Sequence, residues 1–313
     1  MQRNITLDYF KIFLSILVIT IHIPYPYQTE GALNWWWYIP NGIARIAVPF
    51  FFIINGYFFA KKIDDTKAIK KYLIHLLIIY TTWFIIYLRP FIYQTEQSSI
   101  FSDFRIDILL EAYVMGYFHI WYLPALIGGI ILLVLLKKMI RHDVVILIIA
   151  LLLYITGYIL EPGKESLYFV RNGLFFGFPF IAIGYYIHKI DIKNIKNQYI
   201  ILIASVMLIL LLVEAFISYK TLHTRDLYLS LLILCPSLFL LTTKYSILKE
   251  SNKYSLYLGS LSSAIYFSHV YVIFKSFTIF EVTPITRFFV VLLITIPVSI
   301  FIIFVNKRIK IFL

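Results

Sequence analysis

Long apolar runs recur along nearly the whole chain of 313 residues, and they constrain its fold more than any other feature. An α-helix needs about twenty residues to cross a bilayer, and each run is close to this length. Hydropathy and loop charge together predict ten such helices. We therefore expect an all-α, polytopic membrane helix bundle that forms a single domain over residues 1–313. The approximate bounds are 7–24, 42–60, 72–92, 119–136, 143–160, 171–188, 198–218, 227–243, 255–275 and 287–306.

The composition excludes an ordinary soluble protein. Hydrophobic residues make up 61% of the chain and charged residues 14%, whereas soluble domains are about 45–50% apolar and about 25% charged. The net charge of +12 does not indicate nucleic acid as a partner. The cations gather in short loops, where they set the orientation of the helices in the lipid bilayer.

Lysine and arginine are concentrated in every second loop. Because cytoplasmic loops carry the excess of these residues, the alternation predicts that both termini lie in the cytoplasm. We expect a multi-pass protein of the cell membrane, in a bacterial plasma membrane. The residues that carry this signal are Lys61, Lys62, Lys67, Lys70, Lys71, Lys137, Lys138, Arg141, Lys189, Lys193, Lys196, Lys244, Lys249, Lys253, Lys307, Arg308 and Lys310.

Ionisable side chains interrupt the first two apolar runs: Asp8, Lys11 and His22 in the first, and Arg45 in the second. A Lys, Arg or Asp near the bilayer centre costs roughly 2.5–3.5 kcal/mol, so such residues indicate a functional site. Lys11 and His22 differ by about 20° around the helix and by about 16 Å along it. This spacing predicts a polar line through much of the bilayer. The alternative is interfacial groups that snorkel, and it fits Asp8 best and His22 least.

Four motifs resemble the acyltransferase-3 family of integral membrane proteins. Lys11 is followed by His22 after ten intervening residues, and residues 45–57 are similar to the family's Arg, Val-Pro-x-Phe-Phe and Ser-Gly-Tyr pattern. Residues 119–123 resemble its His-Leu-Trp-Phe-Leu, and residues 258–269 resemble its late Ser-x-x-Ile-Tyr-Leu-x-His. The motifs stand in the family's order and span nearly the whole chain, and ten helices is also the family's layout.

This resemblance implies transfer of an acyl group, often acetyl from acetyl-CoA, to a hydroxyl of an extracytoplasmic glycan or lipid-linked acceptor. A histidine with its ordinary pKa of about 6.5 suits the removal of the hydroxyl proton, and His22 is the candidate. Lys11, held by Asp8 about one helical turn away, is a candidate to bind the phosphates of acyl-CoA. Arg45 also belongs to the candidate donor site. Because its helix begins on the outer side, we expect Arg45 beside His22, at the thioester carbonyl.

The chain departs from the family pattern at two positions. Lys11 stands where Arg is commoner, although the family admits either, and it keeps the charge but loses the planar fork of Arg. Asn55 replaces the usual Ser. Neither change removes the candidate base.

Six further residues are expected to bind the acceptor or to line the cavity. For the stretch of residues 119–123, an interfacial aromatic belt is an equal alternative. For the histidine of the ninth helix, the alternative is a packed side chain that is hydrogen-bonded to a neighbouring helix. For the arginine, the alternative is ordinary interfacial charge. The six are His119, Trp121, Tyr122, Arg171, Tyr266 and His269.

Residues 171–177 and 225–229 are similar to a subgroup, the membrane half of the vancomycin-resistance serine racemases. In that subgroup an amino acid has been the suggested membrane-side substrate. We interpret Asp226, within the second stretch, as ordinary interfacial charge. No metal-ligand spacing and no Gly-x-Ser-x-Gly or Walker motif is present, so we expect no metal and a direct transfer assisted by His22.

Two other classes of protein remain open from the sequence. A polar line through an apolar bundle also fits a transporter for a small polar substrate such as an amino acid, although the chain shows no repeated half of the kind that transporters often have. The other class is an accessory protein of a cell-wall assembly complex that has no activity alone. The sequence identifies neither the acceptor nor the acyl length.

Overall fold

The computed structural model describes residues 4–23, 35–97, 106–161, 169–192, 194–221, 224–245, 253–279 and 281–313, and these contain helices but no strand. The predicted all-α class is therefore confirmed for this part of the chain. The main helices are α1 (Ile5–Ile21), α3 (Ala47–Phe59), α4 (Thr66–Gln97), α5 (Ile106–Met115), α6 (Tyr122–Met139), α7 (Asp143–Leu160), α9 (Phe178–Lys189), α10 (Asn197–Thr221), α11 (Leu231–Lys244), α12 (Lys253–Ile279) and α13 (Pro284–Ile309).

Every one of the ten predicted segments contains a helix. Within the described ranges, seven helical segments are long and apolar enough to cross a membrane. One of them, Tyr38–Lys62, joins α2 (Tyr38–Asn41), η2 (Ile43–Ile46), α3 and η3 (Ala60–Lys62). The other three helices, α1, α9 and α11, have 17, 12 and 14 residues. The chain is thus a multi-pass membrane helix bundle, and the number of ten crossings stays a prediction.

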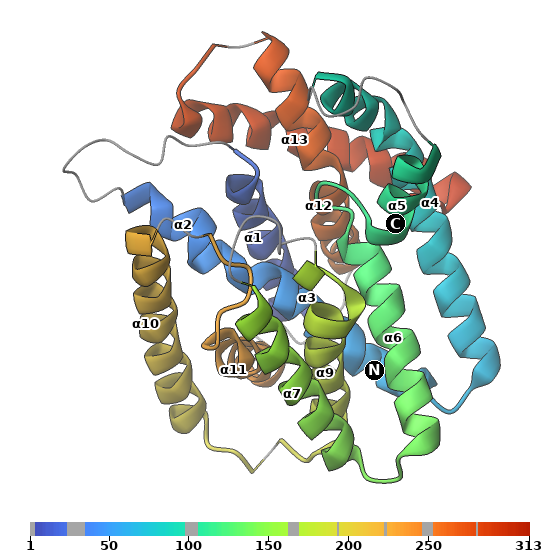
Figure 1. The fold of residues 1–313 in the computed structure, drawn as a ribbon, viewed down its shortest axis with the longest axis vertical. Coiled ribbons are helices and arrows are strands. Elements are labelled where there is room, and N and C mark those ends of the chain that lie inside the picture. Colours follow the sequence, from blue (N-terminus) through green and yellow to red (C-terminus); the bar gives the residue numbers. More distant parts are fainter. Residues whose placement is uncertain are drawn as a thin grey trace.

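The helices form a central group and an outer group. Figure 1 shows α3 running through the middle, with α10 and α4 at opposite edges of the view and α13 across the top. In an apolar stretch of 18 residues within Tyr38–Lys62, 67% of the residues are buried. In the corresponding stretches of α10 and α13, 22% are buried. The outer helices therefore expose their apolar side chains to lipid, and the polar groups of the site lie among the central ones.

Glycine allows the two central helices α3 and α9 to touch backbone to backbone. A Cβ added at Gly56 would lie 2.0 Å from the carbonyl oxygen of Ile181, and one added at Gly184 would lie 2.1 Å from that of Ile53. Helices approach this closely in membranes when small residues face each other, because dispersion contacts replace the hydrophobic effect there. This contact fixes α3, and with it the preceding η2, relative to α9.

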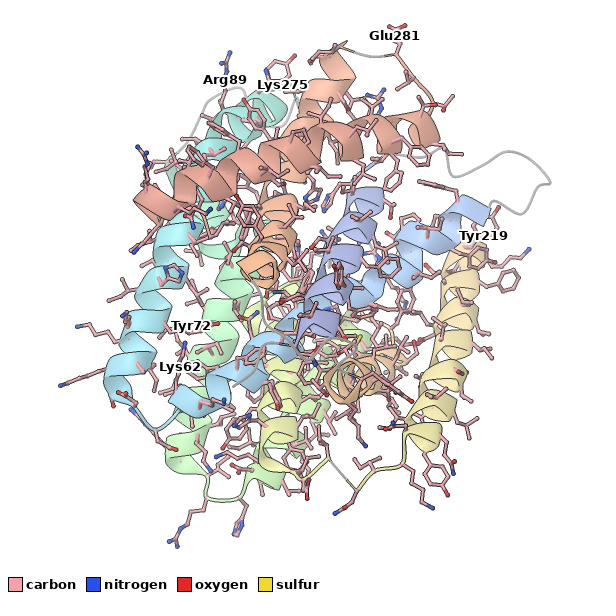
Figure 2. All side chains as sticks on the ribbon, turned by 180° about the vertical axis from the view of Figure 1, so that it is seen from behind. Lys62, Tyr72, Arg89, Tyr219, Lys275 and Glu281 are labelled. Carbon is pink, nitrogen blue, oxygen red and sulfur yellow. The ribbon has the colours of Figure 1, made fainter. Side chains whose placement is uncertain are left out.

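The basic turns lie together at one end of the bundle. The turns that join α3 to α4, α6 to α7 and α9 to α10 are in the lower part of Figure 1. Figure 2 shows Lys62, whose ammonium lies 4.7 Å from the ring centre of Tyr72, near the first of these turns, and Arg89, Lys275 and Glu281 at the opposite end. The beginning of α6 and the end of α7 therefore belong to the end without these turns.

Gly56→Ala should prevent the normal packing of α3 on α9, because the added methyl group meets a backbone oxygen that cannot rotate away. We expect a loss of about 3 kcal/mol in the free energy of unfolding, measured by thermal unfolding of the detergent-solubilised protein. Gly128→Ala is the matched control, since its Cβ would lie 3.6 Å from the nearest atom, an ordinary contact. Equal melting temperatures for the two variants would contradict the packing described here.

Candidate active site

One pocket brings together polar side chains from six separate segments, at the end of the bundle away from the basic turns. The space inside it, measured to the centres of water-sized molecules, is about 50 Å³. This is room for a small reacting group rather than for a whole coenzyme or sugar. Its lining residues are Val18, Ile21, His22, Ala44, Arg45, Val48, His119, Trp121, Arg171, Phe176, Asp226 and Tyr266.

His22 reaches this pocket because α1 ends just before it. Ile21 is the last residue of α1, and the His22 N–H donates to the carbonyl oxygen of Ile19 at 3.2 Å, which closes the final turn. The side chain then faces the pocket together with Val18, one turn earlier. The imidazole therefore lies at the C-terminal end of α1 and lines the pocket rather than facing lipid.

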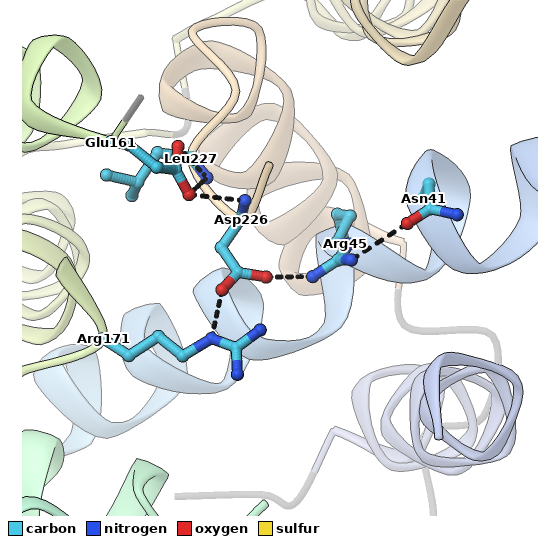
Figure 3. Close-up of polar contacts among 6 residues, drawn as sticks. All are labelled: Asn41, Arg45, Glu161, Arg171, Asp226 and Leu227. Atoms are coloured by element: carbon cyan, nitrogen blue, oxygen red, sulfur yellow. Dashed lines mark hydrogen bonds and ion pairs between the residues drawn. The ribbon is translucent and has the colours of Figure 1, made fainter. Parts of the chain in front are cut away.

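Asp226 joins two arginines from distant parts of the chain (Figure 3). One carboxylate oxygen accepts from a terminal nitrogen of Arg45, and the other accepts from Nε of Arg171. Arg45 also donates to the side-chain oxygen of Asn41 at 3.1 Å. The Asp226 side chain is only 6% exposed. Its two charged partners therefore stabilise the negative charge that water would otherwise solvate.

Glu161 holds the backbone on which Asp226 stands. It accepts from the backbone N–H of Asp226 at 2.7 Å and from that of Leu227 at 3.2 Å. Burial, and then the charge of Asp226, raise the pKa of Glu161 from 4.5 to about 7. For Asp226, burial alone would raise the pKa, but the charges of Arg171 and Arg45 hold the pKa of that carboxyl below its usual value. The two acids therefore differ in their tendency to carry charge.

A turn of π-helix positions Arg171. Asn172 follows it and caps η4 (Gly173–Gly177), because its side-chain oxygen accepts from the backbone N–H groups of Leu174 at 2.8 Å and Phe175 at 3.0 Å. Gly177 lies so close to α6 that an added Cβ would be 2.6 Å from the carbonyl oxygen of Ala125. Single π-turns of this kind often occur at functional sites, and this one directs Arg171 toward Asp226.

Three histidines meet beside the pocket. The ring centre of His22 lies 5.2 Å from that of His269 and 6.0 Å from that of His119, and His119 and His269 are 4.8 Å apart. His269 does not line the pocket itself, and its ring packs against the rings of His22 and His119, which do. Tyr266, one helical turn before His269, donates its hydroxyl to the carbonyl oxygen of His119 at 2.9 Å. The motifs at residues 119–123 and 258–269 therefore lie beside His22, which belongs to the first motif.

Other residues singled out in the sequence lie elsewhere. Asp8 and Lys11 form the expected ion pair at 3.5 Å near the start of α1, and neither lines the pocket. Tyr122 is buried and accepts a hydrogen bond from the Asn55 amide at 2.8 Å, while the hydroxyl of Tyr72 donates to the Asn55 side-chain oxygen at 2.8 Å. Asn55 therefore joins α3, α4 and α6, and Tyr122 belongs to this network rather than to the pocket.

The interpretation of Asp226 as ordinary interfacial charge is wrong, because the residue is buried and doubly paired. Sequence reasoning also missed Glu161, which stands directly after an apolar helix. An acid at a helix C-terminus is unfavourable next to the negative end of the helix dipole, so its presence there is the signal that indicates another role. Among the described residues, no group of three or more His, Cys, Asp or Glu could hold a metal ion.

The sequence profile of a family described as "Acyltransferase domain" matches residues 4–304. The chain belongs to the acyltransferase-3 family. The pocket contains residues of all four motifs that resemble this family: His22, Arg45, His119 with Trp121, and Tyr266.

Curated relatives are racemases by name. Two amino-acid racemases from Enterococcus faecalis are 25% and 26% identical over 260 and 215 residues, 74% and 62% of this chain and 35% and 29% of theirs. A serine/alanine racemase from Enterococcus gallinarum is 25% identical over 298 residues, 87% of this chain and 41% of that protein. The chain thus spans less than half of each of these relatives. No solved structure matches it significantly.

Asp226→Asn should destabilise the protein because two arginine side chains lose the charge that they share. Breaking a buried ion pair on one side costs about 3–5 kcal/mol. Since Asn keeps one acceptor, we expect the free energy of unfolding to fall by about 3 kcal/mol. Asp143→Asn is the control: its pair with Lys137, at 2.6 Å, has both side chains about a quarter exposed, and such pairs contribute about 1 kcal/mol or less. Similar melting temperatures for the two variants would contradict the assigned role of Asp226.

The raised pKa of Glu161 predicts a pH dependence of stability. Because the folded state binds this proton more tightly than the unfolded state, the contribution is complete below the unfolded pKa of 4.5 and is lost as the pH rises through about 7. Between about pH 5 and pH 8, the melting temperature of wild type should therefore fall more steeply than that of Glu161→Gln, which cannot titrate. Parallel curves for the two proteins would show that Glu161 does not titrate in this range.

Proposed function

We propose that this acyltransferase-3 protein is an integral membrane O-acyltransferase. It moves an acyl group, acetyl in the simplest case, from cytoplasmic acyl-CoA to a hydroxyl of an extracytoplasmic cell-surface glycan or related acceptor. The observation that carries the proposal is that His22, directly after α1, and Arg45, in η2, line the same small polar pocket. Transfer of an acyl group from a thioester to a hydroxyl uses a base to remove the hydroxyl proton. It also uses a hydrogen-bond donor to stabilise the charge on the carbonyl oxygen.

His22 acts as the base. As the hydroxyl oxygen attacks the thioester carbonyl carbon, the hydroxyl proton passes to the imidazole and the carbonyl oxygen gains negative charge. The C–S bond then breaks, and the leaving thiolate takes the proton from His22. The imidazole returns to its neutral state, so a direct transfer needs no covalent enzyme intermediate.

Arg45 stabilises the oxygen that gains charge. Asp226 and Asn41 occupy two of its nitrogens, whereas its Nε–H is buried and has no hydrogen-bond partner. An unsatisfied buried donor is costly, and an oxyanion in the adjacent pocket would satisfy it. Because Asp226 fixes the guanidinium in advance, little reorganisation is needed when the charge develops.

The donor and acceptor enter from opposite sides in this proposal. The pocket lies at the end of the bundle opposite the basic turns, which the positive-inside rule assigns to the cytoplasm. Asp8 and Lys11 lie near the other end of α1. Along the helix axis, Lys11 is about 16 Å from His22. There the ammonium of Lys11 would bind the phosphates of the coenzyme, while the acyl-bearing arm of the coenzyme extends toward the pocket.

His22→Gln should reduce acyl transfer by at least about 100-fold, since general-base catalysis contributes typically 10²–10⁴-fold. The measurement is transfer of label from [¹⁴C]acetyl-CoA to the envelope fraction of cells that express the protein, together with release of free coenzyme thiol. His75→Gln is the control, because His75 is exposed on α4. Wild-type rates in a folded His22→Gln variant would exclude His22 as the base.

The same preparation separates this function from transport. If purified wild type in vesicles moves a small polar substrate such as serine without any acyl donor, and transfers no label from acetyl-CoA, the transporter alternative replaces the acyltransferase. The names of the racemase relatives give the reason to use an amino acid as the transported probe.

A further inference from the structure

The tautomers of His119 and His269 are set by the backbone of α12. Nε2 of His119 lies 3.2 Å from the carbonyl oxygen of Phe267, and Nδ1 of His269 lies 2.7 Å from that of Tyr266 and 3.1 Å from that of Ile265. A carbonyl oxygen only accepts, so each of these ring nitrogens carries the proton and donates it. The other nitrogen of each neutral ring therefore presents a lone pair.

Both lone pairs are buried without a donor. His119 is 1% exposed and His269 is fully buried, and neither Nδ1 of His119 nor Nε2 of His269 has a hydrogen-bond partner. A buried acceptor without a partner costs about 1–3 kcal/mol. Two such acceptors on rings 4.8 Å apart indicate a place where a proton or an N–H group is received during function.

His22 is the nearest source of that N–H group. Two imidazoles joined by an N–H···N hydrogen bond have ring centres about 5 Å apart, and His22 and His269 are 5.2 Å apart. The charged and titratable groups around His22 come from η2, the turn before α6, the segment before η4, the loop before α11, and α12. They are Arg45, Arg171, Asp226, His119, Tyr266 and His269.

We propose that His269, backed by His119, is a positioning residue for His22. When His22 takes the acceptor's proton on its pocket-facing nitrogen, the N–H on its other nitrogen is donated to the lone pair of His269. This hydrogen bond forms as His22 gains the proton, and it stabilises the imidazolium during the reaction. An imidazole pair thus does here what a carboxylate does for the histidine of other acyl-transfer enzymes. The inference rests on the proposed function of His22.

Two substitutions separate this role from packing. In His269→Asn, the amide reaches the position of Nδ1 and keeps the bond to the Tyr266 carbonyl, but the acceptor at the Nε2 position is lost. In His269→Gln, the side chain is longer and places its oxygen near the Nε2 position, so the acceptor is retained. A purely structural role predicts that the Asn variant is the milder change, whereas the positioning role predicts the opposite.

The first readout is independent of acyl transfer. Diethyl pyrocarbonate modifies neutral imidazole, so its reaction with His22, followed against pH by peptide mass spectrometry, reports the protonation of that ring. Because His269 stabilises the imidazolium, the pH midpoint of His22 modification should fall by at least about half a unit in His269→Asn and by less in His269→Gln. Identical midpoints in wild type and both variants would overturn the proposal.

The second readout is the pH profile of label transfer from [¹⁴C]acetyl-CoA. The acidic limb should move to lower pH in His269→Asn, with a maximal rate at least tenfold below that of His269→Gln. Equal rates and limbs would overturn the positioning role. If wild type transfers no label but the modification midpoint still shifts, the proposed function fails while the coupling of His269 to His22 stands.

Discussion

The site depends on one ion cluster, in which the carboxylate of Asp226 holds Arg45 and Arg171 from different helical segments. Two guanidinium groups near a membrane interior repel each other and are costly to bury, so they stay close only around a shared anion. Glu161 secures that anion by binding the backbone N–H groups on either side of its attachment. The cluster therefore sets the distance between η2, the segment before η4 and the loop before α11.

The surrounding bundle serves this arrangement. Close contact between α3 and α9 at Gly56 and Gly184 fixes the helix that follows Arg45 against the helix that follows Arg171. Asn55 ties the same α3 to α4 and α6 through two tyrosine hydroxyls. The outer helices α10 and α13 contribute mostly lipid-facing surface. Rigidity near the pocket matters because a preorganised donor stabilises developing charge without moving.

Sequence patterns predict the helices well because apolar length is a local property and the bilayer imposes it. They also single out His22, Arg45, His119, Arg171 and Tyr266, which the structure brings to one pocket, since charge and histidine in apolar runs are conspicuous. They fail for Asp226 and Glu161, whose burial depends on how a loop folds between helices. They also fail to separate Tyr122, a packing residue, from Trp121 beside it, because both belong to the same motif and only the orientation of each side chain distinguishes them.

The most direct test of the account is the position of a bound donor. Electron cryo-microscopy of the protein in nanodiscs with a non-reactive acetyl-CoA analogue, in which a methylene group replaces the thioester sulfur, would show it. We expect the carbonyl of the analogue within hydrogen-bond distance of Arg45 and close to His22, with its phosphates toward Lys11. An analogue bound elsewhere, with the pocket of His22 and Arg45 lacking density, would contradict the assignment of this pocket as the place of acyl transfer.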